Sequence, residues 1–313
     1  MKLSAAASSS LRSALAGPAR PATWLGATPA ALYLQIAGEP GVLALLAHDA
    51  VRLPCALVLP TTRAELPLVA TVAAADNEPL VGDGAVTWTG PAGPVVVRAV
   101  REWAPARVGR GTVAASALQA LCAVLPAPDT LGIDSMLLPM LTSQPAAAVA
   151  ELLGRGPGLT PAGDDVLAGF LLGARAFGHD AAEARAAAAA LAPAHTTALS
   201  AALLWHAARG ECIDELAAVA AALSRHSRSE GNRTKRCLTG HGELEQALRR
   251  LLAVGHTSGA ALAVGLSAAA GAAANVMVAA PMTLYQQQGP NHDVSGQRPE
   301  LRASAGFTAG ATA

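Results

Sequence analysis

The chain is organised around one stretch, Gly154-Arg155-Gly156-Pro157-Gly158-Leu159-Thr160-Pro161-Ala162-Gly163-Asp164-Asp165, and the apolar run Val166-Leu167-Ala168-Gly169-Phe170-Leu171-Leu172 that follows it. The first part predicts a turn, and the second predicts a buried helix that begins near the two acids. Glycine allows positive φ and a close backbone approach, and the free N–H groups of a helix start suit an anion. The stretch therefore predicts a site for a substrate or phosphate, with binding residues Gly156, Gly158, Thr160 and Gly163.

Two adjacent carboxylates, Asp164 and Asp165, stand at this helix start. One acid can cap the helix, which stabilises it by about 1 kcal/mol. The other is free to hold Mg²⁺, to bind an amide or ammonium group, or to move a proton. Both are candidate catalytic residues, Mg²⁺ stays open as a cofactor, and no residue is assigned as a metal ligand. A kinase that holds ATP on this loop is disfavoured, because no Gly-Lys-Ser or Gly-Lys-Thr follows the glycines.

A second motif, Gly255-His256-Thr257-Ser258-Gly259, precedes another helix of small residues. Either hydroxyl residue is a natural N-cap, and the positive end of the helix disfavours protonated His256. His256 is therefore a third candidate catalytic residue, and the candidate binding residues here are Thr257, Ser258 and Gly259. A simple capping turn with a hydrogen-bonded histidine is the alternative. If this helix lies beside the first one, their N-termini meet at one site.

The third motif is His195-Thr196-Thr197-Ala198-Leu199-Ser200, within a predicted helix that stops at Gly210. Thr197 and Ser200 are three residues apart and share a helix face, so they are candidate binding residues that line a polar pocket. Hydroxyls at such positions also often bond back to their own helix.

Secondary structure changes along the chain. Short apolar runs separated by Gly and Pro predict strands at 32–36, 42–46, 55–59, 81–89 and 95–100, the last two forming a hairpin. Apolar residues at helical spacing predict helices at 112–124, 145–154, 164–177, 181–191, 195–209, 212–223, 242–254 and 258–277. The predicted fold is α+β, with a β-rich N-terminal part followed by an all-helical C-terminal part with Gly-rich helix N-termini.

This organisation predicts four regions. They are a flexible N-terminus (1–20), a β-rich domain (21–110), a helical domain with the motifs (111–282) and a disordered tail (283–313). The basic segment 224–240 is expected to be a solvated loop between helices, with an anion-binding patch as the alternative. The uncharged stretch Gly259–Pro281 is rich in Ala and Gly and indicates a buried helix better than a membrane span.

The composition of the chain excludes several classes of function. The 313 residues are 52% hydrophobic but only 3% aromatic, so the core must consist mainly of small aliphatic side chains. Lys and Arg number 22 and Asp and Glu 22, so no basic excess indicates nucleic acid. Four cysteines without a C-x-x-C pair indicate neither a zinc ribbon nor a redox motif, and they favour a cytoplasmic protein with reduced thiols. The N-terminus resembles a transit peptide only superficially.

Together the three motifs resemble the family of AllH-type proteins. The residues that carry the resemblance are Gly-Pro-Gly-Leu-Thr-Pro-Ala-Gly-Asp-Asp at 156–165, Thr-Thr-Ala-Leu-Ser-Ala-Ala-Leu-Leu at 196–204 and Gly-His-Thr-Ser-Gly-Ala at 255–260. The resemblance spans roughly 20–280, and the basic segment and the Gln-rich tail depart from the family pattern.

The resemblance implies a subunit of an oxamate carbamoyltransferase in allantoin (purine) catabolism. The implied reaction transfers a carbamoyl group between oxalurate and phosphate, with carbamoyl phosphate as product, and the implied partners are other subunits of the complex. The implied ligand is a small anion, either phosphate or oxalurate, and His256 would give a proton to the leaving nitrogen. The alternative is a non-catalytic scaffold or small-molecule-binding protein in which the glycines serve helix packing.

Overall fold

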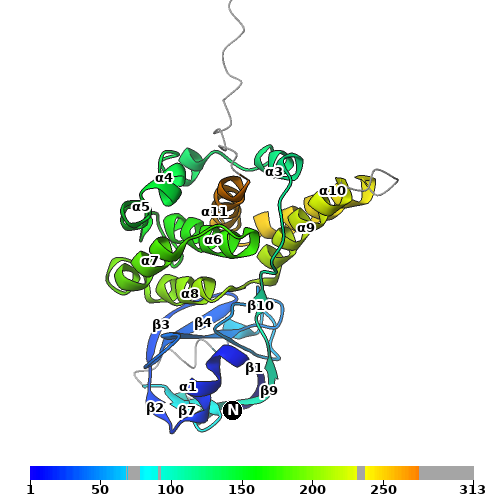
Figure 1. Ribbon diagram of the computed structural model, residues 1–313. Helices are drawn as coiled ribbons and strands as arrows, with labels where there is room; N and C mark the ends of the chain where they lie inside the picture. Colours follow the sequence, from blue (N-terminus) through cyan, green and yellow to red (C-terminus); the bar gives the residue numbers. More distant parts are fainter. Residues whose placement is uncertain (68, 70–77, 91–92, 231–236, 275–313) are drawn as a thin grey trace, which may run out of the picture. The chain divides into compact units, whose positions relative to one another are not determined.

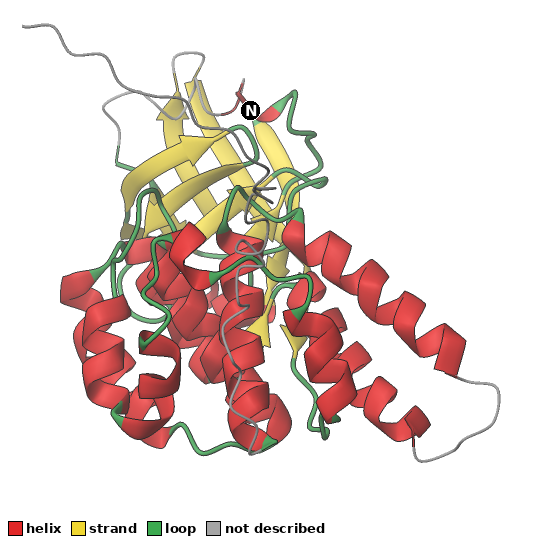
Figure 2. Cartoon of the chain, turned by 90° about the horizontal axis from the view of Figure 1, so that it is seen from above, coloured by secondary structure: helices red, strands yellow, loops and turns green. Residues whose placement is uncertain are grey.

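A computed structural model describes residues 1–67, 69, 78–90, 93–230 and 237–274. All of them lie in one compact unit, Met1–Pro281. Strands gather in the N-terminal part and helices in the C-terminal part (Figures 1 and 2), so the predicted α+β class is confirmed. The expected tail, 283–313, lies outside the described residues.

A nine-stranded mixed sheet forms the β-rich part. In sheet order its strands are β2 (Arg20–Pro21), β7 (Leu80–Gly82), β8 (Ala85–Gly90), β9 (Gly93–Trp103), β1 (Lys2–Ser8), β6 (Ala56–Val58), β5 (Val42–Leu46), β4 (Ala31–Gln35) and β3 (Thr23–Thr28). Neighbouring strands are antiparallel except for the pairs β1–β9 and β5–β6. The antiparallel pairing of β8 with β9 confirms the predicted hairpin.

The expectation of a flexible N-terminus over 1–20 is wrong. Lys2–Ser8 forms β1 in the middle of the sheet, where it pairs with β9 on one side and β6 on the other. The following helices, η1 (Ser9–Leu11) and α1 (Arg12–Ala16), bury Leu11 and Leu15. Alanine and serine have little strand preference of their own, so β1 depends on pairing with β6 and β9, which its local sequence does not indicate.

The helical part contains the predicted helices and some that were not predicted. Its helices are α3 (Ala115–Cys122), η2 (Pro128–Leu131), α4 (Leu137–Ser143), α5 (Pro145–Leu152), α6 (Ala162–Phe177), α7 (Ala182–His195), α8 (Ala198–Ala208), α9 (Asp214–Glu230), α10 (Cys237–Leu252) and α11 (Ser258–Ala273). A two-stranded ribbon, β10 (Ala106–Arg107) with β11 (Glu211–Cys212), completes the elements. Helix α4 was not predicted, since it is short and Pro139 lies in its first turn.

The expected loop over 224–240 is also wrong for most of its length. Helix α9 continues to Glu230 and α10 begins at Cys237, which leaves only 231–236 outside the description. Arg225 on α9 donates from Nε to Glu243 Oε2 on α10 at 3.0 Å. The helical spacing of apolar residues ends before this segment. The helices continue into it because α9 and α10 pack against each other.

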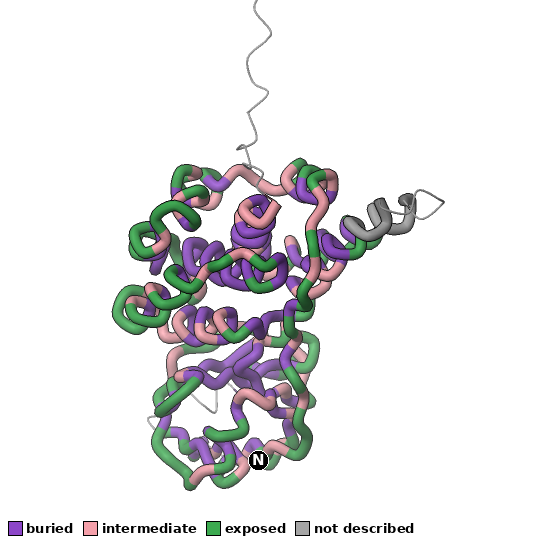
Figure 3. Tube along the Cα trace, viewed as in Figure 1, coloured by how far each residue is buried: buried purple, intermediate pink, exposed green. Residues whose placement is uncertain are grey.

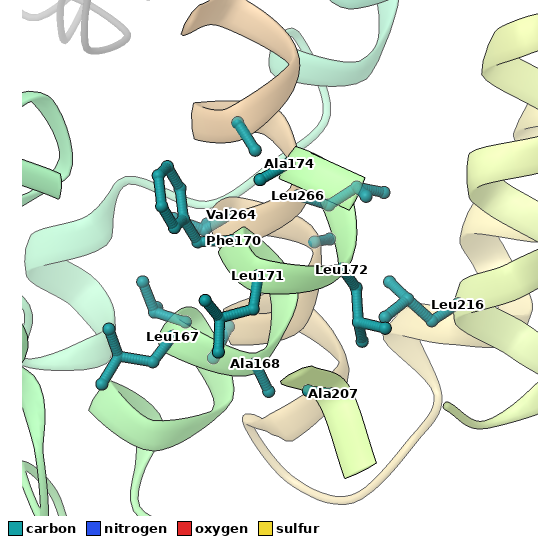
Figure 4. Packing of buried hydrophobic residues seen from close by; sticks show 14 of the residues in the cluster. Leu167, Ala168, Phe170, Leu171, Leu172, Ala174, Ala207, Leu216, Val264 and Leu266 are labelled. Carbon is teal, nitrogen blue, oxygen red and sulfur yellow. The ribbon is translucent and has the colours of Figure 1, made fainter. Parts of the chain in front are cut away.

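Helix α6, which contains the paired acids, is the central helix of the C-terminal part. Every residue from Ala162 to Phe177 is buried except Arg175. A helix that is apolar on all sides must be surrounded by other elements. Figure 3 shows α6 and α11 as mostly buried tubes, and Figure 4 shows Leu172 beside Leu216 and Phe170 near Val264 within the same cluster of buried side chains.

Glycines allow α6 and α11 to contact each other through their backbones. A Cβ at Gly169 would lie 2.1 Å from the Leu262 carbonyl oxygen, and one at Gly265 would lie 1.9 Å from the Val166 carbonyl oxygen. These distances are far below any real carbon–oxygen contact. The interior glycines of both helices therefore have a packing role, and the two helices run in the same direction with their N-termini together.

Strand β5 joins the two parts because both of its faces are buried. Leu43 and Leu45 face the interior of the β-rich part, whereas the opposite face, formed by Val42, Ala44 and Leu46, packs near Leu199 and Ala202 of α8. Figure 1 shows α8 lying next to this sheet.

A buried polar cluster around Glu211 on β11 adds to this junction. Its carboxylate accepts from Arg107 Nη2 at 2.6 Å and Ser10 Oγ at 2.9 Å, and it lies 2.8 Å from His206 Nδ1. Burial alone would raise the pKa of Glu211, but hydrogen bonds from His206, Arg107 and Ser10 together lower it to about 2. Glu211 is therefore ionised and hydrogen-bonded to residues from distant parts of the chain.

Within the described residues, no helix has the length and apolar character needed to cross a membrane. The uncharged stretch Gly259–Pro281 is the buried helix α11 as far as Ala273, as predicted.

Adding a methyl group at Gly265 should separate α6 from α11. We expect Gly265→Ala to lower the free energy of unfolding by about 2 kcal/mol or more, because the added Cβ must displace the Val166 carbonyl. The measurement is urea denaturation of the purified chain.

Gly242→Ala is the matched control. Gly242 is also inside a helix, α10, but a Cβ there would meet nothing within 4 Å. Alanine should stabilise that helix by about 0.5–1 kcal/mol. Equal stability of the Gly265→Ala chain and the unmodified chain would contradict the close contact.

Candidate functional site

The three sequence motifs meet at the N-terminal end of α6. Thr160 Oγ1, just before α6, lies 3.0 Å from Ser258 Oγ, the first residue of α11. Thr197 Oγ1, just before α8, donates to the Leu159 carbonyl at 2.6 Å. Three helix starts that are far apart in sequence are thus joined by hydroxyl groups around one loop.

Asp164 is buried inside this junction and does not cap α6. The helix begins at Ala162 and its N-cap residue is Pro161, so neither acid takes the capping role that the sequence left open for one of them. Instead Asp164 Oδ1 accepts from the Gly154 N–H at 2.9 Å, and Oδ2 accepts from the Thr196 hydroxyl. This carboxylate connects the preceding loop to the start of α8.

The surroundings of Asp164 raise its pKa. The residue is only 2% exposed. Burial raises the pKa of Asp164, and the Thr196 hydroxyl, the Gly154 N–H and the Ser200 hydroxyl reduce that rise without cancelling it. Removal from water outweighs the hydrogen bonds and the favourable end of the helix dipole.

Asp165 differs from Asp164 because one of its oxygens has no partner. Asp165 is 6% exposed, and its Oδ2 has no hydrogen-bond partner in the described part of the chain. Burial, with a further contribution from the charge of Asp164, raises the pKa of Asp165 to about 7, although the Ser258 and Thr160 hydroxyls act in the opposite direction. A carboxyl group that titrates near neutral pH can both give and accept a proton.

Ser200 contributes a hydroxyl that lies near Asp164 but makes no hydrogen bond of standard geometry. Its Oγ is buried, and the residue is 2% exposed. The Ser200 N–H donates to Thr197 Oγ1 at 3.0 Å, so Thr197 is the side-chain cap of α8. Buried polar atoms normally have partners, so two oxygens without a standard hydrogen bond near one junction indicate a place where a ligand or water can bind.

A family comparison covers the part of the chain that contains these motifs. Residues 152–270 match the family model described as oxamate carbamoyltransferase subunit AllH. This region is AllH-like. It includes the paired acids, the α8 motif and the start of α11, so all three motifs lie in the matched segment. No curated protein and no solved structure matches the chain.

The glycines predicted to bind a ligand in the AllH-like region fall into two groups. Gly156 and Gly158 lie in the exposed loop with φ of 112° and 96°, values that favour glycine. Gly163 and Gly259 are instead at close backbone contacts, because a Cβ at either would lie 2.0 Å from Leu152 O or 1.8 Å from Leu251 O, respectively. The second pair therefore has a packing explanation that does not require a ligand.

His256 and Thr257 lie in the turn before α11 and are less involved than predicted. His256 is exposed and makes no hydrogen bond or ion pair with another described residue. Thr257 occupies the N-cap position of α11 without a side-chain cap. Of the second motif, only Ser258 is joined to the acidic junction by a side-chain contact.

Sequence reasoning missed two residues that hold Asp164, namely Thr196 and Gly154. Thr196 is adjacent to the candidate Thr197, and a pair of threonines before a helix is one more hydroxyl than capping requires. That surplus was the available signal. Gly154 contributes only its backbone N–H, which no side-chain pattern reveals.

The contacts of the two acids bear on whether Mg²⁺ could bind at this site. The part of the chain that the structure describes contains no group of three or more His, Cys, Asp or Glu side chains placed to hold a metal ion. Both Asp164 oxygens already accept hydrogen bonds, so Asp165 Oδ2 is the carboxylate oxygen of the pair that lacks a partner. A Mg²⁺ ion at this site remains a prediction.

The raised pKa of Asp165 should appear in the pH dependence of stability. Between the ordinary value of 3.8 and about 7, the folded chain binds this proton more tightly than the unfolded chain. Stability from Asp165 is thus fully present below about pH 4 and is lost as pH rises to about 7. We expect Asp165→Asn to remove this loss, so that the variant gains on the order of a few kcal/mol relative to the unmodified chain between pH 4.5 and 8.

Urea denaturation at both pH values measures this gain. Asp129→Asn is the control, since Asp129 is exposed and its side chain makes no hydrogen bond or ion pair with another described residue. Its pH dependence should match that of the unmodified chain. The same slope for Asp165→Asn would show that Asp165 does not titrate near neutral pH.

Proposed function

We propose that the chain is a subunit of an oxamate carbamoyltransferase-like complex, and that Asp165 takes part in carbamoyl transfer between oxalurate and phosphate. The observation that carries the proposal is the buried, unpartnered Asp165 Oδ2 at the meeting point of three motifs inside the AllH-like region. Allantoin catabolism in the cytoplasm, partner subunits, and the absence of nucleic-acid and membrane partners belong to the same proposal.

The chemistry requires a group that moves a proton. A phosphate oxygen attacks the carbamoyl carbon of oxalurate, the bond from that carbon to the amide nitrogen of oxamate breaks, and the nitrogen needs a proton. Protonated Asp165 can donate it, and the proton lost from hydrogen phosphate restores the acid. A pKa of about 7 suits a group that alternates between the two forms at neutral pH.

The neighbouring groups would position the substrate. Both Asp164 oxygens accept hydrogen bonds, from the Gly154 N–H and the Thr196 hydroxyl, so this carboxyl group would hold the loop and the start of α8 in place around the substrate. Ser200 Oγ is available to donate to a carbonyl or carboxylate oxygen. His256, exposed on the adjacent turn, remains the proton donor proposed from the sequence for a substrate bound nearer the surface.

Access to Asp165 requires a change at the surface, which a partner subunit would supply. Asp165 Oδ2 has almost no exposed area, and the loop from Arg155 to Leu159 beside it is exposed. The Thr197–Leu159 hydrogen bond attaches that loop to α8. We propose that this loop is the part of the site that partner subunits contact, which would couple assembly to substrate entry.

Activity of the reconstituted complex tests the proposal. We expect Asp165→Asn to lower kcat for carbamoyl phosphate formation by about 100-fold or more, because proton transfer typically contributes that much. Asp129→Asn, on the exposed surface, should leave kcat unchanged. Unchanged kcat in the Asp165→Asn complex would overturn the catalytic role.

The second candidate function, a non-catalytic scaffold or small-molecule-binding subunit, is favoured by the packing role of Gly163, Gly169, Gly259 and Gly265. In that case Asp164→Ala would lower the melting temperature and leave ligand binding and complex activity intact. A complex in which Asp164→Ala and Asp165→Asn both retain full activity would establish the scaffold role.

A further inference from the structure

A cavity of about 470 Å³ lies at the opposite end of α6 from the paired acids. Its lining includes Arg110, Arg175 and Arg185, with Asp180 as the one acidic residue. Arg175 is eleven residues beyond Asp164 on α6, which places the two about 16 Å apart along the helix axis. The cavity is therefore a separate feature from the candidate active site.

The three arginines of this cavity outnumber its one acidic residue. None of them forms an ion pair with another residue in the described part of the chain. Asp180 already accepts from the Ala182 N–H at 2.9 Å, at the start of α7. Three arginines and one aspartate among the lining residues produce a local positive potential in a chain whose formal net charge is zero.

Backbone contacts place two of these arginines. The Gly111 N–H donates to the Ala176 carbonyl at 2.8 Å, which fixes the preceding Arg110 beside the last turn of α6. Gly210, with φ of 82°, leaves room for the Arg175 side chain, since a Cβ there would lie 2.4 Å from Arg175 Nε. Arg110 and Arg175 are thus placed by specific backbone contacts, although their side chains are exposed.

The rest of the lining adds apolar surface. The start of α7 does not add a donor there, because the Ala182 N–H already donates to Asp180 Oδ1 at 2.9 Å. Leu171 and Phe177 form part of the wall and offer apolar surface. The volume of the cavity lies in the range of small-molecule sites, roughly 300–1,000 Å³, and exceeds what a lone phosphate group fills.

We infer that this cavity binds a small organic diphosphate, with its phosphates on Arg110, Arg175 and Arg185 and its organic part against the Leu171–Phe177 wall. Each guanidinium group can donate two parallel hydrogen bonds to a pair of phosphate oxygens. Two linked phosphates offer enough oxygens for several arginines, whereas a single carboxylate does not. The inference rests on the cavity alone and does not require the proposed carbamoyl transfer.

Calorimetric titration of the purified full-length chain tests this inference with pyrophosphate, ADP and adenosine as probes. We expect saturable binding of pyrophosphate, tighter binding of ADP, and much weaker binding of adenosine. Arg110→Gln and Arg185→Gln, both at exposed positions, should each weaken pyrophosphate and ADP binding by about tenfold.

Arg250→Gln is the matched control, because Arg250 is an exposed arginine on α10 that does not line the cavity. It should leave all affinities unchanged. Absence of binding for both phosphate compounds at about 10 mM, or equal affinity in all three variants, would overturn the inference. This experiment measures only ligand binding and no carbamoyl transfer. Its outcome therefore tests the cavity independently of the proposed function.

Discussion

The direct backbone contact between α6 and α11 is the constraint on which the rest of the structure depends. Gly169 and Gly265 lie where a Cβ would collide with a carbonyl of the other helix, at 2.1 and 1.9 Å. Glycine inside a helix costs about 0.5–1 kcal/mol relative to alanine, so such positions persist when close packing offsets the cost. The same contact brings the first residues of both helices together, as the Thr160–Ser258 pair shows.

Burial of two carboxyl groups follows from that contact. Because α6 is enclosed on nearly all sides, residues in its first turn have little exposure to water, and both acids are held where their charged forms are disfavoured. Hydrogen bonds from Gly154 and Thr196 compensate Asp164 in part, whereas Asp165 keeps an oxygen without a partner. The two acids therefore differ in that both oxygens of Asp164 accept hydrogen bonds, whereas one oxygen of Asp165 has no partner among the described residues.

The two ends of α6 thus have opposite electrostatic character. Acids without nearby basic partners stand at its N-terminal end, and the arginines Arg110, Arg175 and Arg185 surround a cavity at its C-terminal end. Arg175 is also the one exposed residue of this helix, in its last turn, where a cation is favoured by the helix dipole. A chain with no net charge can therefore still offer separate local environments for a proton-transfer group and an anion.

Periodicity and punctuation in the sequence determined the α+β class and most helices, including their Gly-rich starts, because these depend on local spacing of apolar residues and glycines. Asp164, Asp165, Thr160, Thr197, Ser200 and Ser258 were identifiable for the same reason. Only the tertiary structure decided that Lys2–Ser8 is a central strand, that Asp164 accepts from Gly154 and Thr196, and that His256 stays exposed. Strand pairing, burial and backbone hydrogen bonds join residues far apart in the chain, so no local pattern contains them.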